Sequence, residues 1–138
     1  MKKFRGYIFS RSFLGERVPQ NIQNLFIRDF CLRNNFTFLL SATEYAMKNS
    51  SLMLFKILNE LKSIDGVIMF SLRQLPENER DRTFVLNKFI EKKKILYFAL
   101  ENKSLKNKKD LIMIEEILSV IKITLSNKID IEEFKKLL

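Results

Sequence analysis

The chain has 138 residues, which fits one domain, and its 46% hydrophobic and 30% charged residues are typical of a globular protein. It contains no histidine, which excludes Ser-His and Cys-His nucleophile pairs and every histidine-based metal site. The single cysteine, Cys31, excludes an intramolecular disulfide and is expected to be a small buried helix residue, and the net charge of +9 favours anionic partners.

Strand-like and helix-like segments alternate from the start of the chain. In the first helix we expect Ile22, Phe26 and Phe30 to face the core, because they recur at steps of four. Such alternation predicts right-handed βαβ units and a three-layer α/β/α fold with a mostly parallel sheet of four or five strands. The predicted strands are Phe4–Ser10, Phe36–Leu40, Val67–Phe70 and Lys94–Leu100, and the predicted helices between them are Pro19–Asn34, Ser51–Lys62 and Glu79–Glu91.

The last quarter of the chain departs from this alternation. We expect one domain over residues 1–138, with an α/β core at 1–105 and helices at 106–138. The first of these helices, Asp110–Leu125, has a wide apolar face that suits packing on the sheet, homodimerisation, or both. A final short helix, Asp130–Leu137, is expected to bury its apolar side chains. The seam of the first helix is Leu111, Ile114, Leu118, Ile121 and Leu125, and the short helix would bury Ile131, Phe134 and Leu137.

Polar loops follow each of the first three predicted strands. In open α/β sheets, ligands bind beyond the carboxyl ends of the strands, so these loops are expected to form one site. The polar residues after the first strand are Ser10, Arg11, Ser12, Arg17, Gln20 and Gln23; those after the second are Ser41, Thr43, Glu44, Tyr45 and Asn49; and those after the third are Ser71, Arg73, Gln74 and Glu77.

These residue types suit recognition of an anion. Arginine offers forked donors to phosphate or carboxylate, and hydroxyl and amide groups add neutral hydrogen bonds. A desolvated carboxylate and a tyrosine would serve as base and acid. The predicted ligand-binding residues are Arg11, Ser12, Arg17, Gln20, Ser41, Arg73 and Gln74, and the predicted catalytic residues are Ser10, Glu44 and Tyr45. We expect no metal and no cofactor.

Other signals are weak. The basic clusters Glu91–Lys94 and Ser104–Lys109 are interpreted as solvated charge, because no aromatic residues interleave them, so nucleic acid is not an expected partner. Three glycines are too few for a dinucleotide fingerprint or a P-loop. No apolar run is long enough to span a membrane, and the first residues lack a signal-peptide pattern, so a cytoplasmic location is expected.

Residues 4–105 resemble the catalytic domain of serine resolvases, through Gly6-Tyr7-Ile8 and the stretch from Gly66 to Asn102. The resemblance implies strands in the order 2-1-3-4, with an additional edge strand allowed, and a long dimerisation helix. It does not extend to the functional residues. Phe9 stands where resolvases have an arginine, Arg11 where they have the nucleophilic serine, Arg73 and Gln74 replace an Asp-Arg pair, and Glu77 replaces a second arginine. No DNA-binding domain is expected to follow, so the sequence argues against recombinase activity.

A second resemblance covers nearly the whole chain. The segments RGYIFSRSFLGERVPQNIQNLFIRDFC, LLSATEYAM and FSLRQLPE are similar to a family of small proteins found sporadically in bacterial surface-carbohydrate biosynthesis clusters. It implies a role near sugar or nucleotide-sugar assembly and no particular reaction. The leading hypothesis is therefore a protein that binds, and would convert, an anionic sugar or nucleotide sugar. The alternatives are a non-catalytic scaffold or regulator of a carbohydrate enzyme, and a degenerate resolvase-like protein that binds nucleic acid.

Overall fold

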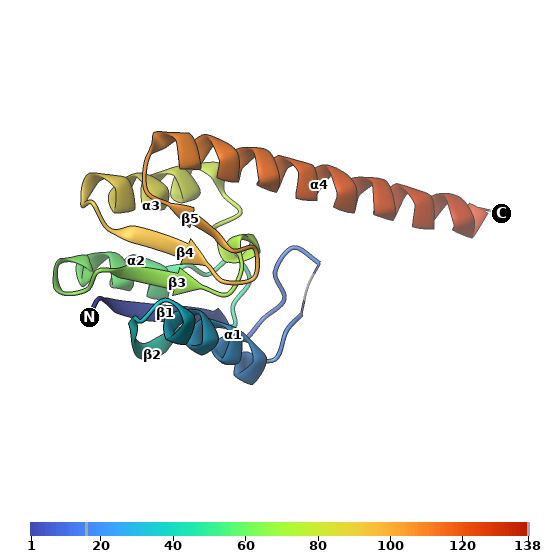
Figure 1. The fold of residues 1–138 in the computed structure, drawn as a ribbon. Coiled ribbons are helices and arrows are strands. Elements are labelled where there is room, and N and C mark those ends of the chain that lie inside the picture. Colours follow the sequence, from blue (N-terminus) through green and yellow to red (C-terminus); the bar gives the residue numbers. More distant parts are fainter. Residues whose placement is uncertain (16, 138) are drawn as a thin grey trace.

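A five-stranded sheet with the strand order β2-β1-β3-β4-β5 forms the middle layer of the protein (Figure 1). The arrangement comes from a computed structural model that describes the backbone of residues 1–15 and 17–137 and the side chains of 1–15, 17–127 and 135–137. Strands β1 to β4 run parallel, and β5 pairs antiparallel with β4. The predicted α/β class and mostly parallel sheet are confirmed.

The first βαβ unit consists of β1 (Lys3–Phe9), α1 (Gln20–Arg33) and β2 (Thr37–Glu44). Helix α1 begins directly after Pro19, whose carbonyl accepts hydrogen bonds from the first turn. Strand β2 lies at the edge of the sheet and runs four residues beyond its predicted end at Leu40. It continues because its polar residues still pair with β1, as Glu44 does with Phe9.

The middle of the chain supplies two more parallel strands. The apolar run of β3 is completely buried, as expected for a strand covered on both faces. Helix α3 has its predicted bounds, because the Asn78 side chain caps its first turn and accepts a hydrogen bond from the Asp81 N–H. These elements are α2 (Leu52–Asn59), the short 3-10 helix η1 (Leu61–Ser63), β3 (Gly66–Met69), the 3-10 helix η2 (Leu72–Gln74), α3 (Glu79–Glu91) and β4 (Ile95–Phe98).

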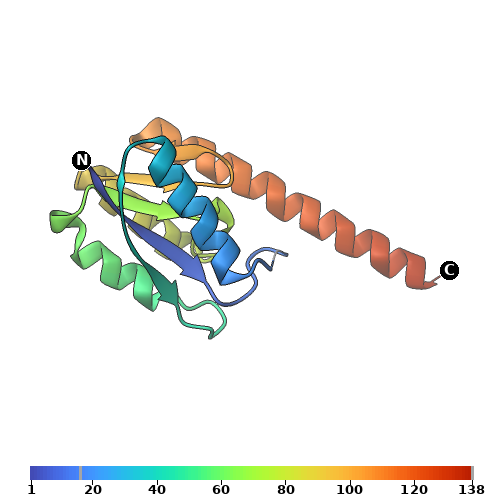
Figure 2. The same ribbon diagram turned by 60° about the horizontal axis from the view of Figure 1, so that its bottom comes forward.

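Helices cover both faces of the sheet. Helix α1 lies on one face, and α2 and α3 lie on the other (Figures 1 and 2). On the α1 face, the Phe30 ring lies 4.9 Å from the Tyr97 ring. On the other face, the Phe55 ring of α2 lies 5.9 Å from the Phe84 ring of α3. Each helical layer is therefore held by aromatic contacts as well as by aliphatic packing.

The C-terminal part consists of β5 (Lys103–Leu105) and one continuous helix, α4 (Lys108–Leu137). The prediction of two separate helices is wrong, because the polar run at 126–128 contains no glycine or proline to end the first. Ile114 and Leu118 are buried against the domain, and further along the helix projects past the sheet (Figure 1). The predicted burial of Leu137 is also wrong, since this side chain is 85% exposed at the end of the projecting part. The predicted burial of Ile131 and Phe134 lies outside the described side chains.

Helix α1 buries a different face from the predicted one. Ile22 and Phe26 are about two-fifths exposed, whereas Ile27 and Cys31 are buried together with the predicted Phe30. The polar Gln23 is buried as well, because it makes hydrogen bonds to the sheet, and this rotates the inward face by one residue. Burial raises the pKa of the Cys31 thiol to about 11.

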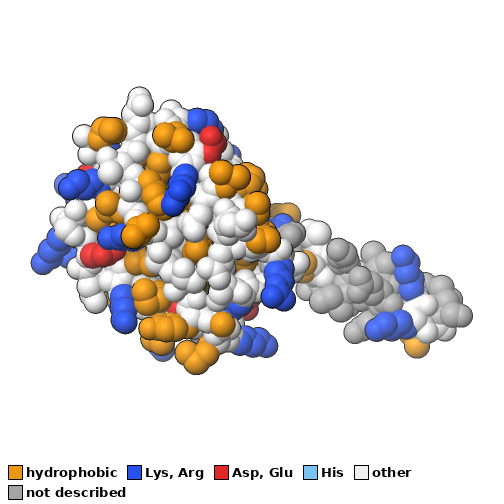
Figure 3. Space-filling model, turned by 90° about the horizontal axis from the view of Figure 1, so that it is seen from below, with side chains coloured by type: hydrophobic (Ala, Val, Ile, Leu, Met, Phe, Trp, Pro, Cys, Tyr) orange, Lys and Arg blue, Asp and Glu red, His pale blue; other side chains and the backbone are white. Residues whose placement is uncertain are grey.

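The outer surface of α1 and β2 is mixed in character. Figure 3 shows this side from below, with orange apolar side chains interspersed among blue basic ones. The exposed apolar side chains here include Leu25 and Leu32 of α1 and Leu40 of β2. Single exposed apolar residues are ordinary on protein surfaces. Within the described part of the chain, no helix combines the length and apolarity that a membrane span requires.

Candidate functional site

A cleft of about 410 Å³ opens at the carboxyl ends of β1 and β3, the edge at which the sequence predicts a site. Residues from all three predicted loops line it, and among the described lining residues three side chains are cationic and one, Glu77, is a carboxylate. This balance favours an anion. The polar side chains of the lining are Arg11, Ser12, Lys48, Asn49, Ser51, Arg73 and Glu77.

Arg11 connects the first loop to the second. Its guanidinium donates hydrogen bonds of 2.8 Å to the carbonyl oxygens of Tyr45 and Ser50. The same group lies 4.1 Å from the centroid of the Phe9 ring, which forms part of the cleft wall. A guanidinium has five N–H groups, so Arg11 is held in place and keeps donor capacity toward the cleft.

Arg73 connects the third loop to the first. It lies on η2, and its Nη1 donates a 3.2 Å hydrogen bond to the carbonyl oxygen of Leu14. Ser71 begins this turn, where its Oγ accepts a hydrogen bond from the Arg73 N–H. The loop backbone is therefore fixed by capping, and the two arginines of the cleft are positioned by backbone carbonyls from other loops.

Glu44 lies outside the cleft as an internal structural group. Its side chain is 1% exposed, and its carboxylate accepts hydrogen bonds from the hydroxyls of Tyr7 and Ser50 at 2.8 and 3.0 Å. The backbone N–H groups of Met53 and Leu54, in the first turn of α2, also donate to it. The carboxylate thus occupies the N-terminal end of α2, the end of a helix that favours an anion.

The electrostatics agree with this structural role. Burial alone would raise the pKa of the Glu44 carboxyl, but hydrogen bonds from Tyr7 and from the N–H groups of Met53, Tyr45 and Leu54 outweigh it. The pKa therefore lies below its ordinary value. An ionised carboxylate with its lone pairs occupied is poorly suited to act as a general base, which needs a raised pKa and access to substrate.

The other two predicted catalytic residues also lie outside the cleft lining. The described residues that line the cleft include neither Ser10 nor Tyr45. The Ser10 hydroxyl lies 3.4 Å from the Glu44 carbonyl oxygen. The Tyr45 side chain is 45% exposed, and its backbone N–H donates to the Glu44 carboxylate. Ser10, Glu44 and Tyr45 therefore lie close together, joined by hydrogen bonds that involve backbone atoms. None of the three is part of the cleft lining.

A pair of buried glutamines underlies the carboxyl edge. Gln23 brackets the end of β1, since it accepts a hydrogen bond from the Phe9 N–H and donates to the Phe9 carbonyl, each at 2.9 Å. Gln74 donates a 2.7 Å hydrogen bond to Gln23, and its own carbonyl accepts one from the Ser71 N–H. The sequence predicts that Gln74 binds ligand. In the structure its side chain instead connects Ser71, after β3, with Gln23, which holds the end of β1.

Three predicted ligand-binding residues lie elsewhere. Ser41 is inside β2, where it donates a 2.6 Å hydrogen bond to Asn24 and lies against Gly6. A Cβ at Gly6 would collide with the Ser41 hydroxyl, which would have to move. Gln20 is the exposed first residue of α1, and Arg17 is exposed in the preceding loop.

Sequence reasoning missed two polar residues of the cleft. Lys48 and Ser51 both line it, and neither was predicted as a site residue. Lys48 is the lysine of the predicted second loop, so its charge in a loop beside Arg11 was the signal that could have identified it. Among the described residues, no group of three or more metal-binding side chains is suited to hold a metal ion.

Solved structures with a similar fold include an integrase catalytic domain and a resolvase family site-specific recombinase. The N-terminal catalytic domain of TP901-1 integrase superposes with a TM-score of 0.61 at 12% sequence identity, covering 93% of this chain and 98% of that one. A resolvase family site-specific recombinase from Streptococcus pneumoniae gives a TM-score of 0.56 at 17% identity, covering 97% of this chain and 95% of that one.

These likenesses establish the fold class and no activity, because the identities are low. The predicted resolvase-like fold and its strand order, with β5 as the additional edge strand, are confirmed. No protein-family model matches the chain. No curated protein matches it either, so the resemblance to carbohydrate-cluster proteins stays a prediction.

Proposed function

We propose that the protein binds a small anionic ligand, a phosphorylated or carboxylated sugar or a nucleotide sugar, in the cleft at the carboxyl edge. The observation that carries the proposal is the convergence of Arg11, Lys48 and Arg73 on one cleft, where Glu77 is the one carboxylate among the lining residues that the structure describes. Guanidinium groups held by backbone carbonyls are already oriented, so less side-chain entropy is lost when they bind an anion.

Neutral groups of the same cleft suit the rest of a sugar. The hydroxyls of Ser12 and Ser51 and the amide of Asn49 supply both donors and acceptors for ring hydroxyl groups. Phe9 and Phe13 add apolar atoms to the lining, and both side chains are almost completely buried. The proposal assigns binding to the cleft and no catalytic step to Glu44, which is occupied by internal hydrogen bonds.

The biological setting is part of the proposal. The carbohydrate assignment depends on the resemblance of three sequence segments, and the cleft lining draws on the first and third of these segments and on the loop that begins in the second. A shared ligand would explain why those segments lie together. The resolvase fold supports neither sugar binding nor recombination by itself.

A thermal-shift screen at moderate salt tests the proposal, with sugar phosphates, nucleotide sugars and acidic sugars as ligands. A ligand at 100 times its Kd should add roughly 2.7 kcal/mol to the free energy of unfolding, which is several degrees for a domain of this size. Lys48→Gln should abolish the shift, while Lys56→Gln, an exposed lysine of α2 outside the cleft, should leave it unchanged. The absence of any shift, or equal shifts in both variants, would overturn the proposal.

A second candidate is an interaction module, a homodimer or a scaffold for another enzyme, built on α4. It is favoured by the exposed apolar side chains Val120 and Ile123, which are 62% and 60% exposed where the helix leaves the domain. The predicted dimer segment Asp110–Leu125 includes both. Light scattering tests it: a dimer that Val120→Lys with Ile123→Lys converts to a monomer would support self-association. If the wild type and the double variant are both monomers, the homodimer hypothesis is rejected.

A further inference from the structure

A second hollow lies between α2 and α3, at the opposite, amino-terminal edge of the sheet. Its volume is about 490 Å³. We call it the α2–α3 groove, and it is independent of the proposed function because it shares no lining residue with the cleft. The side chains that matter here are Phe55, Asn59, Lys62, Phe84, Lys88 and Lys92.

The groove presents an aromatic surface to solvent. The Phe84 side chain, in the middle of α3, is 48% exposed. Its ring lies 5.9 Å from that of Phe55, with an angle of 39° between the ring planes. Phe55 is half-buried beneath it. The pair therefore offers a supported ring surface on which a flat ligand would stack.

Three lysines surround these rings. The Lys88 Nζ lies 5.4 Å from the Phe84 ring centroid and 3.7 Å from the Glu91 carboxylate, an exposed and therefore weak ion pair. Lys62 and Lys92 make no ion pair with any residue that the structure describes. The groove therefore combines an apolar ring surface with two or three cations that are available for phosphate.

This combination is invisible in the linear sequence. The cluster Glu91–Lys94 contains no aromatic residue, and on that ground it was interpreted as solvated charge. Helical geometry supplies the missing aromatic residue, because Phe84, Lys88 and Lys92 are spaced four residues apart, the first two within α3 and Lys92 at its C-cap. The packing of α2 against α3 then adds Phe55.

We propose that the α2–α3 groove binds a nucleotide, either free or as one residue of a single-stranded nucleic acid. The base would stack on Phe84, the phosphate would lie among Lys62, Lys88 and Lys92, and the Asn59 amide would meet the base edge with both a donor and an acceptor. Aromatic rings beside basic residues are how single strands are bound without sequence preference. A duplex is excluded as the ligand, because its bases are stacked on one another and their faces are covered.

Fluorescence anisotropy of a labelled single strand of twelve thymidines, titrated with the full chain, tests binding to the groove. Unlabelled AMP, added as a competitor, distinguishes a site for a free nucleotide from a site for a single strand. Loss of one stacking contact in Phe84→Ala should weaken binding at least about fivefold. The matched control is Phe26→Ala on α1, another half-exposed phenylalanine with a single ring partner, Phe70, and it should bind like the wild type. Thermal denaturation of both variants confirms that each is folded.

Charge is tested separately from stacking. Lys88→Gln with Lys92→Gln removes two charges from the groove, and Lys103→Gln with Lys106→Gln removes two exposed charges elsewhere. The slope of log affinity against log salt should fall by about 1.4 in the groove variant and stay unchanged in the control.

Four outcomes are informative. Displacement of the strand by AMP supports a nucleotide site, and binding of the strand without competition by AMP supports a single-strand site. Equal effects of the groove and control variants would show attraction by net charge alone and would overturn the proposal. The absence of binding to both ligands at low salt would overturn it as well.

Discussion

The hydroxyl of Tyr7 donates a 2.8 Å hydrogen bond to the Glu44 carboxylate, and the two side chains are almost completely buried. Burial raises the pKa of Tyr7 far above its usual range, and the neighbouring Glu44 charge raises it further. The pKa of Glu44 is lowered by the hydrogen bonds it accepts. The pair is thus a neutral phenol and a carboxylate that together join β1, β2 and the start of α2.

Replacement of Glu44 by alanine should destabilise the protein strongly. Two hydroxyl groups and two N–H groups of α2 would lose their acceptor inside the protein, which should lower the free energy of unfolding by roughly 3 kcal/mol or more. Urea denaturation measures the change. Asp29→Ala, which breaks an exposed ion pair with Arg33, is the control and should cost less than about 0.5 kcal/mol. A similar small cost for both variants would contradict the structural role of Glu44.

The contribution of Glu44 should depend on pH in the acid range. Because its folded pKa is lowered, the stabilisation is present above the pKa of about 4.3 expected in the unfolded chain and is lost as the pH falls through the folded value. The difference in unfolding free energy between wild type and Glu44→Gln should therefore be largest near neutral pH and shrink below pH of about 4. Denaturant titrations across this range measure it, and a constant difference at all pH values would count against an ionised Glu44.

Tyr7 should have the opposite dependence in the alkaline range. Its folded pKa is raised, so its stabilisation is present below the unfolded value of about 10 and is lost as the pH rises above it. Tyr7→Phe removes the titrating group together with one hydrogen bond, which should cost about 1 kcal/mol at neutral pH. The variant should then lose less stability than the wild type between about pH 9 and 11. Circular dichroism during denaturation at each pH checks this, with Tyr45→Phe, an exposed tyrosine, as the control.

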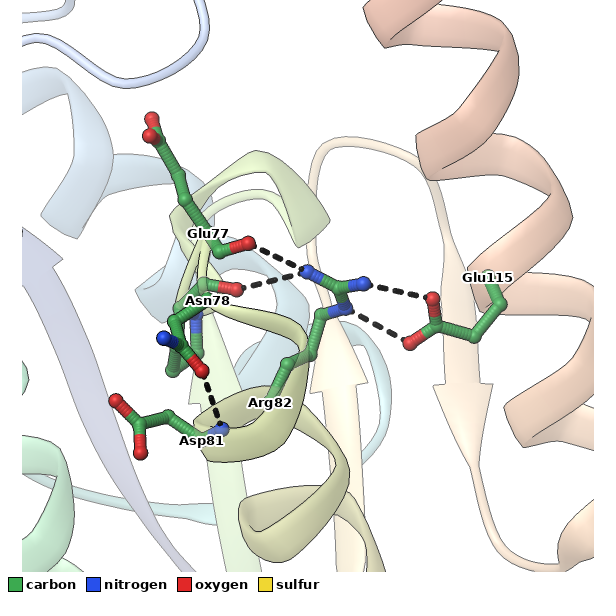
Figure 4. A network of polar contacts seen from close by, with 6 residues as sticks. Glu77, Asn78, Asp81, Arg82 and Glu115 are labelled. Carbon is green, nitrogen blue, oxygen red and sulfur yellow. Dashed lines mark hydrogen bonds and ion pairs between the residues drawn. The ribbon is translucent and has the colours of Figure 1, made fainter.

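The contact between α3 and α4 depends on Arg82. Its Nε and Nη2 donate to the two oxygens of Glu115 at 2.7 and 2.9 Å, and its Nη1 donates to the carbonyls of Pro76 and Glu77 (Figure 4). Arg82 is 4% exposed. Arg82→Ala leaves four buried or half-buried acceptor oxygens without this donor and should cost roughly 3 kcal/mol. Arg82→Lys should recover little of this stability, because lysine lacks the planar, forked donor group of arginine.

Hydrogen exchange provides a second readout for Arg82. Amides of α4 between residues 111 and 118 should lose protection in the alanine variant, since this part of the helix is held against the domain. Amides of α1 serve as the internal control. Equal loss of protection in α1 and α4 would show general unfolding and would argue against a specific docking role for Arg82.

Gly66 should tolerate no side chain. A Cβ at this position would collide with the Ile95 carbonyl oxygen of the neighbouring strand and would lie 2.7 Å from the Phe4 ring. Because backbone in the middle of the sheet cannot move aside easily, Gly66→Ala should cost more than about 3 kcal/mol or prevent folding. Thermal denaturation or soluble expression measures this. Gly15→Ala is the comparison, where strain comes from a φ of +81° and a contact with the Leu125 side chain and should be smaller.

The order of elements was predictable because local signals and tertiary packing agree there. The apolar run of β3 and the capped start of α3 are examples, and both were predicted within a residue or two. The end of β2 was not predictable, since Ser41 and Glu44 are polar residues that usually mark a loop. They belong to the strand because partners from distant segments, Asn24 and Tyr7, satisfy them inside the structure.

The site was predictable in position and only partly in composition. The carboxyl edge follows from the parallel strands, and Arg11, Ser12 and Arg73 do line the cleft there. Whether a polar residue faces a ligand or the protein interior depends on its partners, and these are not encoded locally. Gln74 binds Gln23, and Glu44 binds the first turn of α2. No residue near either of them in the sequence indicates these partners, so the sequence places both residues in the ligand site.

The projecting helix changes how the molecule moves through solution. At about 1.5 Å per residue, the part of α4 beyond Leu118, the last buried residue among the side chains that the structure describes in this helix, extends roughly 28 Å to Leu137. This rod adds much friction and little mass, so a 16.5 kDa monomer should diffuse more slowly than a sphere of the same mass. Size-exclusion chromatography calibrated with spherical standards would overestimate its mass, so the apparent mass of a monomer would approach that of a dimer. Scattered light, which reports mass independently of shape, is therefore the appropriate way to count the chains.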